Sequence, residues 1–387
     1  MISKKRKIVI DRKFIQLLII PLIIIAKIIR YTLMEKLIDY ASGIKILNMI
    51  LYPEYYPNGI ETEGSFWVAS CVFRAINIIN LSTISQWEIY ITIIFNIICV
   101  FFVSKCNKKI DLHQSVFLLC SIGLLNMFVF TLSKEIIQFV FFLLIYVVLS
   151  KEKLSYFRKI IASTSILIFC GAMYRTYFII IAAFFILIIV LHRNLLKKPK
   201  VKTSLIVRTI FLYYCIFGSI LFICNIIAPD ILNEVIIVRQ KTLYNLTLFG
   251  VDTYPASAIK EWLPNDNIFS FLANHFIITI RMLIPIELIP LGIKYIPFII
   301  YQVLVTINLK RAIKTLKSNS NIRNLAIFIY LAFILGSAIF EPDYGSWVRH
   351  ESASFPIMYF VIDSYRKKCK KKDKPKISIL IERSMYG

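Results

Sequence analysis

The chain has 387 residues, of which 58% are hydrophobic, and its mean hydropathy is +0.72. A water-soluble domain of this length would be far less apolar, so the composition indicates a protein that crosses a membrane several times. The formal net charge of +24 would suggest a nucleic-acid partner in a soluble protein. In a membrane protein, an excess of Lys and Arg indicates mainly which loops face the cytoplasm, so we expect no nucleic-acid partner.

About ten apolar runs approach the roughly 20 residues that an α-helix needs to cross the hydrocarbon core. In chain order they are centred on residues 14–34, 87–104, 113–131, 135–150, 159–172, 177–192, 204–227, 279–308, 324–340 and 352–365. The eighth run is long and is interrupted by Pro285, Pro290 and Pro297, and the tenth run is short. The sequence therefore predicts an all-α, polytopic helical membrane protein with a single integral-membrane domain over residues 1–387.

Basic residues distinguish the two sides of this predicted bundle. With the N-terminus in the cytoplasm, the inside segments hold 32 of the 46 Lys and Arg residues and five acids. The outside segments hold nine basic residues and thirteen acids. The inside segments are 1–13, 105–112, 150–160, 192–203, 309–323 and 366–387, and the outside segments are 35–86, 131–135, 172–177, 228–277 and 342–351. Because cytoplasmic loops carry the excess of Lys and Arg, we expect both termini in the cytoplasm. The basic tail 366–387 would be attracted to anionic lipids.

The lengths and motifs of the predicted loops favour some classes of function over others. The outer loops 35–86 and 228–277 are long, and loops of this length usually bind something or form small helices at the membrane surface. The chain has no Gly-rich phosphate-binding loop and no Walker lysine, which argues against ATP-driven transport by this chain alone. Its eight cysteines lack ligand spacing, so we expect no disulfide framework, no metal and no cofactor.

Charged residues gather on the predicted outer side, most densely in the stretch FEPDYGSWVRHESASFP at residues 340–356. Two very short outer turns, TLSKEI (131–136) and GAMYRTYF (171–178), carry further charges. A charge on such a turn is held at the mouth of the bundle, where ionisable groups usually face a cavity or a partner. Arginine pairs bidentately with phosphate, and a nearby carboxylate or imidazole can act as a general base. The resulting candidates are Lys134, Glu135, Arg175, Arg239, Arg281, Glu341, Asp343, Arg349 and His350.

These residues also have purely structural interpretations. Arg175 lies between two tyrosines and would anchor the protein at the membrane interface by snorkelling. His350 would be a structural, hydrogen-bonding histidine, and Asp343 would belong to a turn. Ion pairing with neighbours would account for four others: Lys134, Glu135, Arg349 and Glu351. The convergence of all these residues on one side favours the functional interpretation.

The predicted topology and the stretch FEPDYGSWVRHESASFPIMYF (340–360) resemble the Wzy-type polymerases that join the repeat units of O-antigens and capsular polysaccharides. The resemblance extends over most of the chain. It rests on about ten helices, cytoplasmic termini, large outer loops, arginines on the outer side, and a last outer loop and helix of this kind.

The resemblance implies that the substrate is an undecaprenyl-pyrophosphate-linked oligosaccharide at the outer face of the bacterial cytoplasmic membrane. The growing chain would be transferred from its lipid pyrophosphate onto the next repeat unit. Basic residues would stabilise the leaving pyrophosphate, namely Arg175, Arg349, Arg239, Arg281 and Lys134. The acceptor hydroxyl would lose its proton to Glu341, Asp343, His350 or Glu135. The resemblance implies no cofactor and no metal, and it allows a flippase and a chain-length regulator as partners.

Three other functions remain open from the sequence. A glycosyltransferase that uses lipid-linked sugars would carry acids in the first outer loop, where GIETEGSF (59–66) supplies Glu61 and Glu63. A flippase for lipid-linked oligosaccharides would line a cavity in the middle of the membrane with charge. The predicted helix centres hold few ionisable residues, which favours chemistry at the outer face. A non-catalytic scaffold would tolerate replacement of all the polar residues named above.

Overall fold

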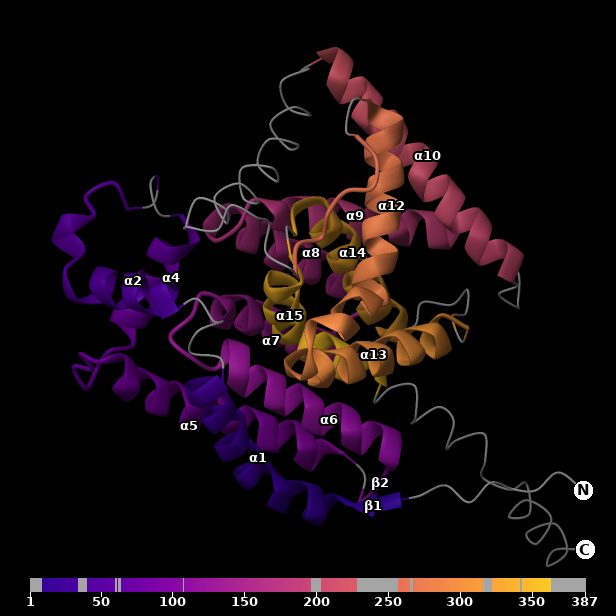
Figure 1. Ribbon diagram of the computed structural model, residues 1–387. Coiled ribbons are helices and arrows are strands. Elements are labelled where there is room, and N and C mark those ends of the chain that lie inside the picture. Colours follow the sequence, from indigo (N-terminus) through magenta and orange to yellow (C-terminus); the bar gives the residue numbers. More distant parts are fainter. Residues whose placement is uncertain are drawn as a thin grey trace, which may run out of the picture.

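The computed structural model describes residues 9–33, 40–59, 61, 64–106, 108–195, 203–227, 257–264, 267–314, 316, 322–341 and 343–362. It is about 83% helical (Figure 1). Seven helices are long and apolar enough to cross a membrane. They are α1 (Arg12–Leu33), α5 (Ile84–Lys105), α6 (Leu112–Leu124) with the π-helix η2 (Leu125–Val129) that continues it, α8 (Tyr156–Met173), α10 (Thr203–Ile227), α13 (Ile296–Lys314) and α14 (Ile322–Phe340). This mostly helical architecture is compatible with the predicted all-α, polytopic membrane protein.

Shorter apolar helices complete the bundle: α7 (Glu135–Ser150), α9 (Tyr177–Leu195) and α12 (Ile268–Leu283). Eight of the ten predicted runs match a helix of the structure to within a few residues. The agreement is good because a membrane helix needs a continuous apolar stretch, and such a stretch is easily recognised in a sequence.

The predicted eighth helix, 279–308, is wrong. The structure divides it into α12 and α13, joined by the 3₁₀ turns η3 (Ile286–Leu291) and η4 (Ile293–Tyr295). Pro285 and Pro290 have no N–H to donate within a helix, and their rings clash with the preceding turn. Gly292 follows with φ +110°, a conformation that side-chain-bearing residues rarely adopt. In Figure 1, α12 stands across the direction of α13.

The prediction that residues 342–351 form a loop is also wrong. Most of this segment is the helix α15 (Tyr344–Ala353), and a further helical stretch follows it over 355–362. The Asp343 carboxylate starts α15 by accepting a hydrogen bond of 2.9 Å from the Ser346 backbone N–H. The polar stretch is therefore the beginning of the last helix of the described chain, and it enters the bundle with its charges.

The predicted long loop 35–86 contains the helices α2 (Tyr40–Leu51) and α4 (Ser65–Ala75) and the short turn η1 (Pro53–Tyr55). Figure 1 shows α2 and α4 side by side, beyond one end of the bundle. Of the second predicted loop, 228–277, the structure describes residues 257–264 and 267–277, and most of the latter belong to α12.

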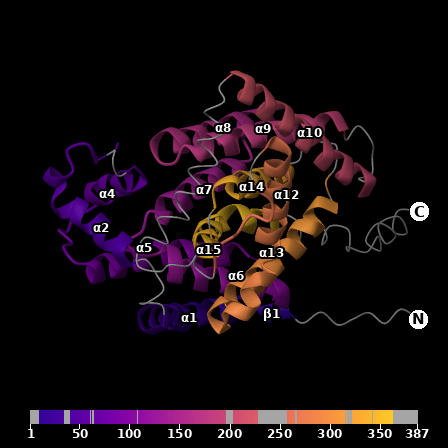
Figure 2. The same cartoon turned by 45° about the horizontal axis from the view of Figure 1, so that its top comes forward.

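The helix α14 forms the centre of the bundle (Figure 2). Fifteen of its 19 residues are buried, although its composition is that of a membrane span. It packs most closely on α9, where a Cβ added to Gly336 would lie 2.5 Å from Ile181 Cγ1. Small residues allow membrane helices to approach in this way. The lipid-facing surface is therefore left to outer helices such as α1 and α10.

A small antiparallel sheet joins two segments that lie far apart in the sequence. The strand β1 (Val9–Asp11) pairs with β2 (Lys109–Asp111), with Ile10 opposite Ile110. This pairing places the segment before α1 and the turn between α5 and α6 together. Both segments belong to the predicted inside set, so the pairing agrees with their assignment to one side.

Candidate functional site

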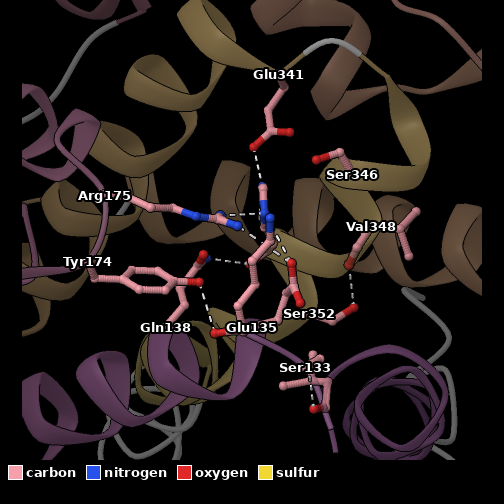
Figure 3. Close-up of polar contacts among 12 residues, drawn as sticks. Ser133, Glu135, Gln138, Tyr174, Arg175, Glu341, Ser346, Val348 and Ser352 are labelled. Atoms are coloured by element: carbon pink, nitrogen blue, oxygen red, sulfur yellow. Dashed lines mark hydrogen bonds and ion pairs between the residues drawn. The ribbon is translucent and has the colours of Figure 1, made fainter. Parts of the chain in front are cut away.

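Four candidate residues from four separate segments meet in one buried cluster (Figure 3). Glu135 is the first residue of α7, Arg175 lies in the turn between α8 and α9, Glu341 follows α14, and His350 lies on α15. Figure 3 shows the Arg175 side chain extending between Glu341 and Glu135. The three short connections that the sequence placed on the outer side thus bring their charges together.

The imidazole of His350 is the centre of this cluster. Its Nδ1 contacts Glu341 Oε1, and its Nε2 lies 2.5 Å from Arg175 Nη1 and 3.6 Å from Glu135 Oε1. Arginine can only donate, so Nε2 accepts from Arg175 and Nδ1 carries the proton that is donated to Glu341. This network sets the tautomer and aims Nε2 at the guanidinium. Arg175 Nη2 also lies 3.6 Å from Glu135 Oε1.

Neighbouring polar groups hold the cluster in place. Gln138 Nε2 donates to the backbone carbonyl of His350 at 2.9 Å, which ties α7 to α15. The Tyr174 hydroxyl donates to the Lys134 carbonyl at 2.8 Å, and Arg175 Nη1 donates to the Tyr177 hydroxyl at 3.1 Å. These contacts between α7, the turn before α9 and α15 tie the segments that carry the cluster to one another.

The cluster has acidic groups with unused acceptor capacity. Burial by itself would raise the pKa of Glu341, but His350 and Arg175 together hold the pKa below its ordinary value. Within the described part of the chain, Glu341 Oε2 and Glu135 Oε1 accept no hydrogen bond, although both side chains are about 97% buried. Buried carboxylate oxygens of this kind are suited to accept hydrogen bonds from ligand hydroxyl groups.

A small cleft with a cavity volume of about 30 Å³ adjoins the cluster. Glu135 belongs to both, and Arg349 forms another part of the wall. The remaining lining residues are Arg30, Ser42, Gly43, Ile84, Glu88, Phe128, Thr131, Leu132 and Ser133. Among the described residues, the Arg349 guanidinium has no hydrogen-bond or ion-pair partner, and its positive charge acts on Glu135. The cleft therefore combines a guanidinium, carboxylates and hydroxyl groups.

One wall of the cleft is built on irregular backbone. The π-helix η2 and the turn after it replace the regular end of α6, and α1 supplies donors to the carbonyls there. Arg30 Nη1 donates to the Met127 carbonyl at 2.8 Å, and Lys27 Nζ donates to the Phe130 carbonyl at 2.7 Å. Arg30 also pairs with Glu88 at 3.2 Å. Irregular backbone at membrane depth is expected only where it is buried in protein or lines a cavity.

Sequence reasoning missed Arg30 and Glu88, because both lie within apolar helices rather than on turns. A signal was present, since an ionisable residue inside a membrane helix is by itself an indication of a site. Gln138 was missed for the same reason. It is fully buried, and its side chain donates to a backbone carbonyl that is 212 residues distant.

The side chains of two of the predicted basic residues have partners outside the cluster. Arg281 forms a bidentate pair with Glu287, with both N–O distances 2.6 Å, and also donates to the Lys260 carbonyl. Lys134 Nζ lies 3.9 Å from the centre of the Phe66 ring in a cation–π contact. Arg281 thus joins the segment before α12 to η3, and Lys134 attaches α4 to the mouth of the bundle.

The remaining predicted site residues lie outside the cluster or outside the described residues. Asp343 is the N-cap of α15, and burial raises its pKa by more than its hydrogen bond and the Arg349 charge lower it. Glu61 is exposed. Arg239 and Glu63 lie outside the described residues. Among the residues that the structure describes, no three His, Cys, Asp or Glu side chains gather as metal ligands would.

Ion pairing with a neighbour, one of the structural interpretations, applies to Glu135, whose carboxylate pairs with Arg175. It does not apply to Arg349 and Glu351 as a pair. Arg349 lines the cleft, whereas Glu351 points to α13 and α14. Residues two apart on a helix do not face one another, which is why Arg349 and Glu351 are separated.

Comparisons with known proteins do not place the chain in a family. No family model, no curated protein and no solved structure matches it. The functional interpretation therefore depends on the geometry of the cluster and the cleft.

Proposed function

We propose that the protein polymerises undecaprenyl-pyrophosphate-linked oligosaccharide repeat units in the synthesis of a bacterial surface polysaccharide. The observation that carries this proposal is the buried Arg175, His350, Glu341 and Glu135 cluster, which adjoins a cleft walled by Arg349. A histidine held by a carboxylate is a suitable general base, and the guanidinium groups of Arg175 in the cluster and Arg349 in the adjoining cleft suit a pyrophosphate leaving group.

In the proposed reaction, an acceptor sugar hydroxyl attacks the anomeric carbon of the lipid-linked chain. The new glycosidic C–O bond forms as the C–O bond to the pyrophosphate breaks, and the bonding electrons leave with the pyrophosphate. Arg175 and Arg349 stabilise the negative charge that develops there. When the guanidinium of Arg175 turns to the pyrophosphate, His350 Nε2 becomes free to accept the hydroxyl proton. Glu341 stabilises the resulting imidazolium.

The proposal includes an orientation, with the cluster at the outer face of the cytoplasmic membrane and both termini in the cytoplasm. The charge distribution of the loops supports it. Ser82 and Lys151 are exposed in turns that this orientation assigns to opposite sides. Cysteine introduced at Ser82 should react with an impermeant maleimide added to intact cells, and cysteine at Lys151 should react only after lysis. The reverse pattern would contradict the orientation.

The functional test compares surface-glycan chain length in Arg175→Ala and Arg349→Ala at equal protein levels. Both changes should shorten the polymer strongly, because each removes a positive charge from the reacting pyrophosphate. Arg74→Ala is the control, since Arg74 is exposed on α4 and, among the described residues, its guanidinium contacts only the Trp67 ring and Cys71. Unchanged polymer length in both Arg175→Ala and Arg349→Ala would remove the site assignment.

A second function, flipping of lipid-linked oligosaccharides, is favoured by one observation. Glu351 is fully buried beside Tyr330, in the middle of α14, so the bundle centre does hold an ionisable group. The two functions differ in their deletion phenotype. Single repeat units on the outside of a deletion strain support a polymerase, whereas units retained inside the cell support a flippase.

A further inference from the structure

The side chains of three consecutive residues of α15 face three different parts of the protein. Arg349 lines the cleft, His350 contacts Glu341 and Arg175, and Glu351 points into the bundle towards α13 and α14. Successive residues of an α-helix are rotated by about 100°, so these three directions follow from the helix itself. Anything that holds Glu351 in place therefore also fixes the rotation of α15, and with it the positions of Arg349 and His350.

The Glu351 carboxyl group is surrounded by neutral partners. Its side chain is fully buried, and the Tyr330 hydroxyl of α14 donates to Oε1. The side-chain amide of Gln302, on α13, faces both carboxyl oxygens, and with the amide turned so that its nitrogen donates, that nitrogen lies 3.2 Å from Oε1. Tyr301 of α13 is fully buried close by, with Cys120 of α6 beside it.

The charged groups near Glu351 contact other partners. On its own helix, the nearest are Arg349, which lines the cleft, and His350, which contacts Arg175 in the cluster. From α7, Glu135 faces Arg175 and His350, and the titratable groups close to Glu351 on the described parts of α13 and α14 are the tyrosines Tyr301 and Tyr330. Among the described residues, no cation contacts the carboxyl group.

A bare carboxylate in this position would be a buried charge without a counter-ion, which is costly in a protein interior and more so within a membrane bundle. Proton uptake removes this cost and lets the carboxyl group donate as well as accept. A position that required only a hydrogen bond would be served equally by glutamine. An acid here adds a group that gains and loses a proton.

We propose that Glu351 is a buried proton-binding site, and that its occupancy holds α15 in the position seen in the structure. In the occupied state a proton taken from water forms an O–H bond to the carboxyl group. Loss of that proton to water leaves a carboxylate between α13 and α14, and α15 shifts to bring it closer to donors or water. The consequence for catalysis, through Arg349 and His350, rests on the proposed function, but proton binding itself does not.

Infrared spectroscopy of the purified full-length protein in lipid nanodiscs tests proton binding directly. At neutral pH the wild type should show the C=O stretch of a protonated, buried carboxyl group, with a downshift in D₂O. The band should be absent from Glu351→Gln and present in Glu88→Gln, because Glu88 is ion-paired with Arg30 and contributes no protonated carboxyl. A wild-type spectrum without the band, or a Glu351→Gln spectrum that retains it, would overturn the proposal.

Trp347 reports on the position of α15. It is fully buried, and its indole N–H donates to the Met282 carbonyl at 3.3 Å. The fluorescence of Trp347 is isolated by subtracting the spectrum of Trp347→Phe. Its emission should change over the pH interval in which the infrared band is lost, and should stay constant in Glu351→Gln. If the Trp347 emission stays constant over the pH interval in which the infrared band is lost, the proposed link to the position of α15 is overturned. Neither measurement involves glycan synthesis, so a failure of proton binding is distinguishable from a failure of the proposed function.

Discussion

Arg175→Ala should destabilise the protein strongly, because it leaves a buried charge without its counter-ion. The Arg175 side chain is 11% exposed and its partner Glu135 is 4% exposed, so the change leaves a buried carboxylate without its ion-pair partner. Removing one partner of a buried ion pair costs about 3–5 kcal/mol. This corresponds to roughly two to four orders of magnitude in the unfolding equilibrium constant.

Arg281→Ala is the matched control for this effect. Arg281 also makes a close ion pair, but its partner Glu287 is 41% exposed and can return to water when the arginine is lost. A pair with an exposed member is worth about 1 kcal/mol or less. We therefore expect the smaller loss for Arg281→Ala, although this pair has the shorter distances.

The assay is reversible unfolding of the purified protein in mixed micelles, followed by circular dichroism. The double variant Arg175→Ala with Glu135→Gln should recover at least about tenfold in the unfolding equilibrium constant, because glutamine removes the uncompensated charge. If Arg175→Ala costs no more than Arg281→Ala, or if Glu135→Gln adds to the damage, Arg175 does not act as the counter-ion of a buried carboxylate.

Three further predictions concern the same bundle. Because the pKa of Glu341 is lower in the folded protein, its contribution to stability is present at neutral pH and is lost as the pH falls below about 4.3, its ordinary value. Wild type should therefore lose more stability than Glu341→Gln between about pH 7 and pH 3, and equal losses would contradict the assignment. Asp343→Ala should cost about 1 kcal/mol, while Asp343→Asn keeps both stability and glycan length, because asparagine also caps helices. Shortened glycans in Asp343→Asn would instead show that the carboxylate takes part in the chemistry. Gly171→Ala should destabilise by roughly 1–3 kcal/mol, because the new Cβ would meet the Ile179 backbone nitrogen at 2.9 Å. Gly218→Ala meets only the end of a leucine side chain and should be tolerated, and equal unfolding midpoints for the two variants would refute this.

The sequence determined the class of the protein and most of its helices. Apolar runs such as 135–150 and 204–227 coincide with α7 and α10, because lipid imposes the same length and composition on every spanning helix. The short connections with Lys134, Glu135 and Arg175 were also readable, since charges stand out between apolar runs. The orientation follows from loop charge alone, and it stays a prediction.

Only the tertiary structure decided which of these charges meet. Arg175 and Arg281 look equivalent in the sequence, but one joins His350 and the other is neutralised by Glu287. The end of α14 and the start of α15 place Glu341 against His350, a contact that depends on the turn between these helices. The cleft wall depends on η2 and on Arg30 from the first helix, almost 100 residues away. Contacts of this kind depend on how helices pack, which the spacing of residues along one helix does not specify.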